Sequence, residues 1–158
     1  MISFELRPYN EENDDFLFDL YASTRAEELQ SWGWTDLQRE LFLRQQYEAQ
    51  RQSYRLQFED ADHQIVVAAG QPIGRMMVAR GEDEYRLIDI SLLPQYRGTG
   101  IGTQILRGLL CEASDARRPV RLSVTKINPA ARLYARLGFV VTDDDGLYLQ
   151  MTADPRHG

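Results

Sequence analysis

The stretch that decides the fold is residues 95–102, which read QYRGTGIG, taken together with the segments on either side. Residues 85–93 before it read YRLIDISLL and have the composition of a strand, and residues 103–110 after it read TQILRGLL, with apolar side chains at helical spacing. Glycines at alternate positions of the turn remove the side chains that would keep a ligand away from the backbone. The first amides of a helix also lack intrahelical acceptors and lie at the positive end of its dipole. The pattern therefore predicts a strand–turn–helix unit that binds phosphate or pyrophosphate.

Two common phosphate-binding motifs do not fit this turn. The dinucleotide fingerprint requires a glycine three positions after Gly100, where Thr103 stands, and it belongs to a βαβ unit rather than a β-meander. A Walker A loop ends in Gly-Lys-Ser/Thr, and no lysine follows Gly100 or Gly102. A glycine-rich turn without a ligand and the phosphate site of another cofactor remain as alternatives.

The N-terminal third is predicted to be one strand followed by two helices. Residues 2–7 alternate apolar and polar side chains, as a strand does, and Pro8 ends the pattern. Apolar residues at helical spacing indicate a helix from about residue 13 to 29, with an uncertain break at 22–26. A capping box of Thr35 and Gln38 starts a second helix that runs to about residue 54. The side chains expected to face inward on this second helix are Leu37, Leu41, Leu43 and Tyr47.

The remaining two thirds alternate strands and helices. The expected strands are residues 63–69, 73–80, 85–93, 120–124, 139–143 and 147–151, and the expected helices are residues 100–117 and 129–137. The first three of these strands form an antiparallel meander and the last two a closing hairpin. We expect one mixed α/β (α+β) domain over residues 1–153, with the order β-α-α-β-β-β-α-β-α-β-β, and a disordered tail at 154–158.

Composition excludes several classes of protein. Of 158 residues, 43% are hydrophobic and 27% charged, as in ordinary soluble globular domains. The formal net charge of −6 argues against nucleic-acid binding, which requires a basic surface. The single cysteine, Cys111, excludes an intrachain disulfide framework. No apolar run approaches the roughly 18 residues of a membrane helix, and residues 1–7 lack the apolar core of a signal peptide. We therefore expect a cytoplasmic protein that does not act at a membrane.

Two motifs resemble the signatures of one enzyme superfamily. Gln95-x-x-Gly98-x-Gly100 resembles the acetyl-CoA signature Gln/Arg-x-x-Gly-x-Gly/Ala of the GNAT N-acetyltransferases. Residues 128–139, NPAARLYARLGF, resemble its second signature, Asn-x-x-Ala-x-x-x-Tyr-x-x-x-Gly-Phe, although Asn128 lies one residue closer to Tyr134 than in that signature. The resemblance covers residues 63–151 and implies a GNAT-like, mostly antiparallel central sheet flanked by helices.

The resemblance implies transfer of an acetyl group from acetyl-CoA, as a cosubstrate, to an amine. The loop amides would hold the CoA pyrophosphate, and the pantetheine arm would lie between the strands at 85–93 and 120–124. One strand amide would polarise the thioester carbonyl, on which negative charge develops in the transition state. The implied cofactor-binding residues are Ile90, Ser91, Leu92, Gln95, Arg97, Gly98, Thr99, Gly100, Ile101, Gly102, Asn128 and Tyr134.

Two catalytic residues are expected, each with a structural alternative. Tyr134 occupies the family position of a general acid near the CoA sulfur, and it could instead be a core aromatic. Asn128 either contacts CoA or caps the helix that follows. Asp89 interrupts an apolar strand and is the candidate general base, or it forms a salt bridge with Arg75 or Arg86. Strict alternation places Leu87, Asp89 and Ser91 on one face of this strand, and Ile88, Ile90 and Leu92 on the other.

The acceptor side is the less defined part of the predicted site. Glu27, Glu28, Trp32 and Trp34 could form an acidic and aromatic pocket for a cation, or the tryptophans could pack their loop onto the sheet. The expected partners are acetyl-CoA and a primary amine of a small molecule or peptide, with no metal and no nucleic acid. A homodimer is a further expectation, since the terminal hairpin offers free edges. The alternative function is a non-catalytic acyl-CoA-binding domain with a regulatory or interaction role.

Overall fold

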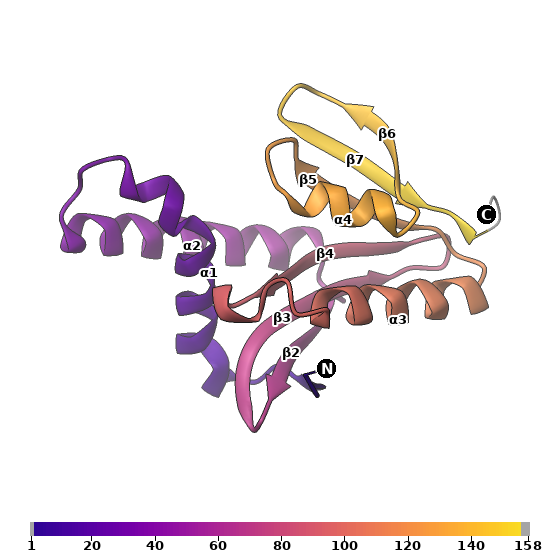
Figure 1. Ribbon diagram of the computed structural model, residues 1–158, viewed down its shortest axis with the longest axis horizontal. Coiled ribbons are helices and arrows are strands. Elements are labelled where there is room, and N and C mark those ends of the chain that lie inside the picture. The colour runs from indigo at the N-terminus through magenta and orange to yellow at the C-terminus, as the bar shows by residue number, and fades with distance from the viewer. Residues whose placement is uncertain (1, 156–158) are drawn as a thin grey trace.

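The computed structural model describes residues 2–155, which form a seven-stranded sheet with helices on both faces (Figure 1). The strand order is β1-β2-β3-β4-β5-β7-β6, and every neighbouring pair is antiparallel except β4 and β5. The strands are β1 (Glu5–Pro8), β2 (Asp62–Ala68), β3 (Gln71–Arg80), β4 (Tyr85–Leu92), β5 (Val120–Thr125), β6 (Val140–Asp144) and β7 (Tyr148–Ala153). The helices are α1 (Asp14–Gln30), α2 (Asp36–Gln57), α3 (Ile101–Asp115) and α4 (Ala130–Arg136), with short 3-10 turns at Glu11–Asn13 and Pro94–Tyr96.

The predicted fold class and element order are confirmed. The mixed, mostly antiparallel sheet and the sequence of strands and helices match the expectation, with boundaries shifted by a few residues. The expected break at residues 22–26 is absent, because α1 runs unbroken from Asp14 to Gln30. Residues 156–158 of the expected C-terminal tail lie outside the described residues. No helix within residues 2–155 is both long and apolar enough to cross a membrane.

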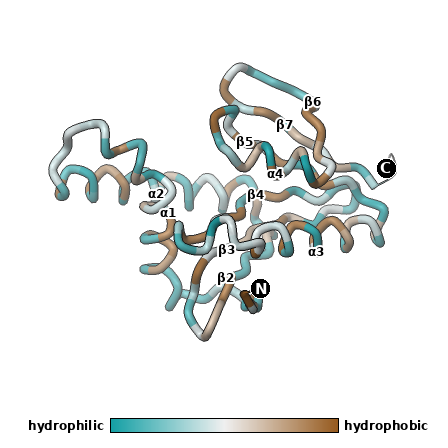
Figure 2. The backbone as a smooth tube through the Cα atoms, in the orientation of Figure 1, coloured by the Kyte–Doolittle hydropathy of each residue, from teal (hydrophilic) through white to brown (hydrophobic). Residues whose placement is uncertain are grey.

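Two hydrophobic clusters cover the two faces of the sheet. One joins the inner sides of α3 and α4 to the sheet and includes Val78, Leu106 and Leu122. The other joins α1 and α2 to β2 and includes Leu20 and Ile65. Figure 2 shows the corresponding hydrophobic stretches along β2, β3 and α3, and a hydrophilic tip on the β6–β7 hairpin. Burial on both faces explains why β2 and β3 read as nearly continuous apolar runs.

The first half of α2 extends beyond the sheet. The capping box of Thr35 and Gln38 forms as predicted, and Leu43 is buried as predicted. However, Leu37 and Leu41 are 66% and 62% exposed, so their predicted inward position is wrong. Figure 1 shows that the α1–α2 connection and the start of α2 lie to the left of the strands, beyond the edge of the sheet, in agreement with this exposure.

A β-bulge in β4 corrects the predicted faces of this strand. The pairing with β3 shifts between two neighbouring residues: Met77 pairs with Asp89, and Val78 pairs with Leu87. Ile88 is therefore an extra residue on β4 without a partner on β3. Leu87 belongs to the cluster under α3 and α4, and Ile90 and Leu92 pack against that cluster. Leu87 therefore does not share a face with Asp89 and Ser91, because the extra residue reverses the alternation at this point.

Candidate functional site

The glycine-rich turn connects β4 to α3 as the sequence predicts. Gly98 and Gly100 have φ angles of 72° and 91°, a region in which other residues are strained. A Cβ at either glycine would have no atom within 4 Å, so the backbone borders open space. The first α-helical bond joins the Gln104 amide to the Gly100 carbonyl, at 3.0 Å, which leaves the amides of residues 101–103 without intrahelical acceptors. An anion can approach these amides, so the turn fits a pyrophosphate.

Side chains of the turn fix its conformation. The Arg97 Nε–H donates to the Leu92 carbonyl at the end of β4, at 3.0 Å, and the Thr99 hydroxyl donates to the Tyr96 carbonyl, at 2.6 Å. Arg97 is otherwise exposed and carries a cation beside the turn. Gln95 is exposed in the Pro94–Tyr96 turn, and Ile101, the first residue of α3, is fully buried. Ile101 therefore contributes its main-chain amide to the predicted site, while its side chain anchors the helix.

The sheet is open between β4 and β5. Their parallel ladder consists of the pairs Tyr85–Val120 and Arg86–Arg121. Beyond it, β4 continues with β3 as far as Leu92, and β5 continues with β7 as far as Thr125. We call this gap in the ladder the opening; it lies beside residues 90–92, whose amides were predicted to meet the thioester. The expected splay of the two strands is present.

Tyr134 lies on α4 in the cluster under α3 and α4. Its ring packs edge to face on Phe139, with 5.7 Å between the ring centroids. Burial, and after it the Asp89 carboxylate, raises the pKa of Tyr134 to about 12, so the hydroxyl is protonated at neutral pH. Within residues 2–155 this hydroxyl has no hydrogen-bond partner. The core-aromatic alternative is therefore present, and the role of general acid stays a prediction.

Asp89 is held on the opposite face by an ion pair. Arg75 of β3 bonds one Asp89 oxygen through Nη2 at 2.7 Å and Nε at 2.9 Å, and the Ser91 hydroxyl donates to the other oxygen at 2.8 Å. The Arg75 Nη2 also donates to Gln50 of α2, at 3.0 Å. Arg75 is only 6% exposed, and the Asp89 carboxylate raises its pKa against the opposing effect of burial. The salt-bridge alternative to a base role is therefore present, with Arg75 rather than Arg86 as partner.

Sequence reasoning missed two residues of this face. Arg75 was considered only as a possible salt-bridge partner of Asp89. A charged side chain in the otherwise apolar stretch IGRMMV, residues 73–78, was a signal that Arg75 itself belongs to a buried polar site. Tyr54 of α2 was assigned no role, and its ring lies 5.7 Å from the Arg75 guanidinium. Its place next to β4 depends on where α2 crosses the sheet, which residue spacing within the helix does not reveal.

Asn128 lies one residue before the N-cap of α4 and bonds the first amide of the helix. Its Oδ1 accepts a hydrogen bond from the Ala130 amide, at 2.9 Å, just before the helix begins. Pro129 occupies the N-cap position rather than the first helical position that was expected. The capping alternative for Asn128 is thus present, and contact with CoA stays a prediction.

The expected acceptor residues lie apart from Tyr134 and Asp89. Trp32 and Trp34 pack on each other and on Phe42 of α2, with ring centroids 5.0 to 5.7 Å apart. In Figure 1 their loop lies at the far left of the view, well to the left of α4. The tryptophans therefore stabilise the α1–α2 connection, and the structure does not bring them to the opening.

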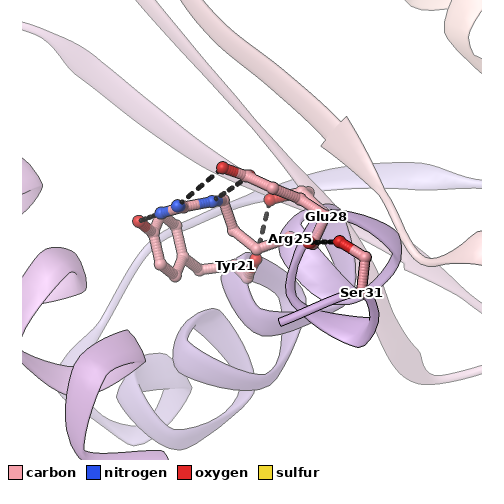
Figure 3. Close-up of polar contacts among 5 residues, drawn as sticks. Tyr21, Arg25, Glu28 and Ser31 are labelled. Carbon is pink, nitrogen blue, oxygen red and sulfur yellow. Dashed lines mark hydrogen bonds and ion pairs between the residues drawn. The ribbon is translucent and has the colours of Figure 1, made fainter. Parts of the chain in front are cut away.

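The two glutamates of that expected pocket, Glu27 and Glu28, have different environments. Arg25 donates to the Tyr21 hydroxyl at 2.7 Å and to both Glu28 oxygens, at 2.7 and 3.2 Å, while Ser31 bonds the Glu28 carbonyl (Figure 3). This pairing lowers the pKa of Glu28. Glu27 is exposed. Glu28 is thus already neutralised by a neighbour on its own helix.

A groove elsewhere on the surface contains none of the residues predicted for the site. It has a volume of about 340 Å³, lies between α1 and α2, and is bordered by Phe18, Ala22, Arg39 and Leu43 among others. Neither Asp89 nor Tyr134 lines this groove.

The comparisons with known proteins agree with the fold and the turn. The model of the acetyltransferase (GNAT) domain matches residues 61–141, half of the chain, which include the turn, the opening and Tyr134. The chain therefore belongs to the GNAT family of acetyltransferases, and the protein is an acyltransferase enzyme. No curated protein is similar enough to this sequence to count as a match.

Solved structures share the fold over nearly the whole chain. The PaiA N-acetyltransferase of Thermoplasma acidophilum, in complex with coenzyme A, is 19% identical, with 97% of this chain and 99% of that chain covered and a TM-score of 0.72. An acetyltransferase of Thermus thermophilus is 17% identical, with 98% and 99% covered and a TM-score of 0.70. A GNAT family acetyltransferase of Elizabethkingia anophelis with acetyl-CoA bound is 14% identical, with 96% and 97% covered and a TM-score of 0.61. At these identities the likeness concerns the fold.

Proposed function

We propose that this protein transfers the acetyl group of acetyl-CoA to a primary amine of a small molecule or peptide. The observation that carries the proposal is the position of the opening beside residues 90–92 of β4, because this stretch leads into the glycine-rich turn at the start of α3 and follows Asp89, whose carboxylate acts on Tyr134. Two structural neighbours contain coenzyme A or acetyl-CoA, which supports the same donor for this chain.

The donor site follows from the main chain. The amides of residues 98–102 and the Arg97 cation would hold the pyrophosphate, because both offer donors or positive charge to an anion. The pantetheine arm would lie in the opening beside Ile90, Ser91 and Leu92. The amides of Ile90 and Leu92 face the gap, because the bond of the Leu93 amide to Ile73 and the alternation of the ladder direct the Ser91 amide to β3. One of these amides would donate to the thioester carbonyl as negative charge develops on its oxygen.

The reaction requires two proton movements. The amine nitrogen attacks the carbonyl carbon, the carbon–sulfur bond breaks, and the amine loses a proton while the sulfur gains one. Tyr134 is the proposed donor to the sulfur, since its hydroxyl is protonated at neutral pH and has no competing partner within the described residues. Asp89 remains the proposed base. Its ion pair with Arg75 is the competing structural role, and substitution separates the two.

The donor site is tested by placing a large side chain in the turn. Gly100→Glu adds bulk and negative charge where the backbone faces open space, so acetyl-CoA should no longer raise the melting temperature. Gly146→Glu is the matched control, because Gly146 also has a positive φ and no atom within 4 Å of a Cβ, but lies in the β6–β7 turn. If acetyl-CoA stabilises the Gly100→Glu protein as it does the control, the cofactor site is elsewhere.

The chemical roles are tested by rates of thiol release with a panel of amines. Tyr134→Phe should lower kcat by about 10²-fold while the KM for acetyl-CoA is retained, as expected when a proton donor is lost. An unchanged kcat would reject the acid role. Asp89→Asn should lower the rate and alter its pH profile if Asp89 is the base. A normal rate with an unaltered profile would leave it as the structural partner of Arg75.

Other finer expectations are also proposals. A homodimer through the free edge of β6, action in the cytoplasm, and independence of metals and nucleic acids all remain predictions about this chain. The dimer has a structural basis, because β6 ends the sheet and all five of its residues are exposed.

A further inference from the structure

Tyr54 occupies the α1–α2 side of the sheet next to the catalytic candidates. It lies one helical turn after Gln50, which bonds Arg75, and its ring lies 5.7 Å from the Arg75 guanidinium. Arg75 in turn holds Asp89 and pairs with Ser91 across β3 and β4. These contacts place the Tyr54 ring over the stretch of β4 that borders the opening.

The Tyr54 hydroxyl is available to a ligand. Within residues 2–155 it makes no hydrogen bond, and since His63 Nε2 is the only fully buried side-chain polar atom there without a partner, the Tyr54 hydroxyl keeps some solvent-accessible surface although the residue is largely buried. Burial, and after it the Asp89 carboxylate, raises the pKa of Tyr54 to about 12. The hydroxyl is therefore protonated at neutral pH and can both donate and accept a hydrogen bond.

Tyr54 and Tyr134 lie on opposite sides of the sheet. Tyr134 comes from α4 and belongs to the cluster under α3 and α4, whereas Tyr54 comes from α2. The Asp89 carboxylate raises the pKa of both, so both lie within its electrostatic reach. Each side of the sheet therefore carries, near Asp89, one tyrosine hydroxyl without a hydrogen-bond partner within residues 2–155.

The ion pair next to Tyr54 carries no net charge. Arg75 neutralises Asp89, and the two other groups bonded to this pair, Gln50 and Ser91, are uncharged. Phe58 lies next to Tyr54, with 6.5 Å between the ring centroids, and adds apolar surface. Such a neutral and aromatic site does not favour a ligand with several cations, and it does not hold an amine in its unreactive ammonium form.

We propose that Tyr54 binds the acceptor amine on the side of the opening away from Tyr134, and that the acceptor is a monoamine with an uncharged or aromatic body. This inference rests on the acetyltransferase function proposed above and names the acceptor class for the same site. The hydroxyl accepts a hydrogen bond from the amine, and the ring and Phe58 pack against its body.

The test uses the full chain with saturating acetyl-CoA and two probe amines, 2-phenylethylamine and the triamine spermidine. Wild-type protein should show the higher kcat/KM with 2-phenylethylamine. Tyr54→Ala should raise the KM for this amine about tenfold or more, and Tyr54→Phe by several-fold, consistent with the loss of one ligand hydrogen bond. The KM for acetyl-CoA should change less than about twofold, because a binding residue for the amine does not act on the donor.

Tyr47→Phe is the matched control. Tyr47 lies two turns before Tyr54 on the same helix but is buried in the α1–α2 cluster, so removal of its hydroxyl should leave both KM values unchanged. An unchanged amine KM in Tyr54→Ala overturns the role of Tyr54. A preference for spermidine overturns the acceptor class.

Failure of the proposed function gives a different result. If acetyl-CoA does not stabilise the protein, the donor site is wrong whatever Tyr54 does. If acetyl-CoA binds but neither amine releases thiol, calorimetric titration of 2-phenylethylamine into the CoA-loaded protein still tests the inference. Binding that is weakened by Tyr54→Ala supports it, and no binding, or equal binding by both proteins, overturns it.

Discussion

Gly74 is a residue at which one carbon atom decides whether β3 and β4 can pair. A Cβ there would lie 2.3 Å from the Ser91 carbonyl oxygen and 3.2 Å from the Leu92 Cα, so main-chain atoms would have to move. We predict that Gly74→Ala destabilises the fold by about 1–3 kcal/mol, as overpacking does, and weakens acetyl-CoA binding by displacing the end of β4. Urea unfolding and thermal shift measure the two effects.

Gly108 provides the control for that substitution. It lies inside α3 with nothing within 4 Å of a Cβ. Gly108→Ala should therefore stabilise the protein by about 0.5–1 kcal/mol through helix propensity. Equal effects of the two substitutions would contradict the assignment of a close contact at Gly74.

His63 is predicted to limit stability in mild acid. Its ring stacks on Tyr9 at 4.6 Å, and its Nε2 is buried without a partner. Burial, and after it the Arg75 cation, lowers the pKa of His63 from 6.5 to about 4. Between these values the unfolded chain binds more protons than the folded one, so stability is lost as the pH falls from 6.5 towards 4.

His63→Phe keeps the stacking and removes this titration. Urea unfolding at about pH 5 and pH 7.5 should show a smaller loss of stability in acid for the variant than for wild type. Asp62 and Glu112 also have lowered pKa values, but they act at lower pH than His63 and are common to both proteins. An identical acid-induced loss in the two proteins would rule out His63 as the cause.

Single residues of the site were predictable to different degrees. The glycines of the turn and Tyr134 lie where their motifs place them, because both motifs sit on short connected elements whose geometry is local. The partner of Asp89 was not determined by the sequence, since Arg75 and Arg86 were equivalent until β3 and β4 were in register. Tyr54 was not predictable, because its position depends on the crossing of α2 over the sheet.

At the scale of elements, α2 begins at a capping box away from the sheet. Its first half extends beyond the sheet, and Thr35 accepts a hydrogen bond from the Gln38 amide at 3.2 Å while Gln38 bonds the Thr35 amide at 2.9 Å. We predict that Thr35→Ala costs about 1 kcal/mol and increases hydrogen exchange in the first turns of α2, with little change near Tyr54. An equal increase in hydrogen exchange along the whole of α2 in the Thr35→Ala protein would contradict this prediction.

The order of the helices and strands was predictable from the sequence, but irregularities within them, such as the bulge in β4, were not. Apolar runs, glycines and prolines mark where strands and helices begin and end, so the order followed from local patterns. The bulge at Ile88 leaves no such mark, because a strand of the same composition pairs with or without an extra residue. Strict alternation therefore assigned Leu87 to the wrong face, and the exposed Leu37 and Leu41 were expected inward for a similar reason.

For the whole molecule, the free edge of β6 predicts the assembly state. Val140 and Val141 are 63% and 51% exposed on a strand without an outer neighbour. An unpaired edge can pair with a second copy, and a lysine on the edge blocks such pairing. We predict a dimer of the wild-type protein in light scattering, and a monomer for Val141→Lys.

Leu56→Lys is the control for this substitution, because Leu56 is 86% exposed on α2, away from the edge. It should leave the dimer intact. A monomeric wild-type protein at tens of micromolar, or a dimer that survives Val141→Lys, would contradict assembly through β6.

The narrow ladder between β4 and β5 has a consequence for cooperativity. Strands β1 to β4 form one hydrogen-bonded ladder and β5 to β7 another, and side chains under α3 and α4 join them more than backbone bonds do. Without a ligand, the amides of β5 beyond Arg121 should exchange independently of those of β4. An acyl-CoA that bonds both strands would act as the missing strand, so it should slow exchange on both sides together, and Gly100→Glu should abolish this joint protection. Acetyl-CoA would then make one cooperative unit out of two.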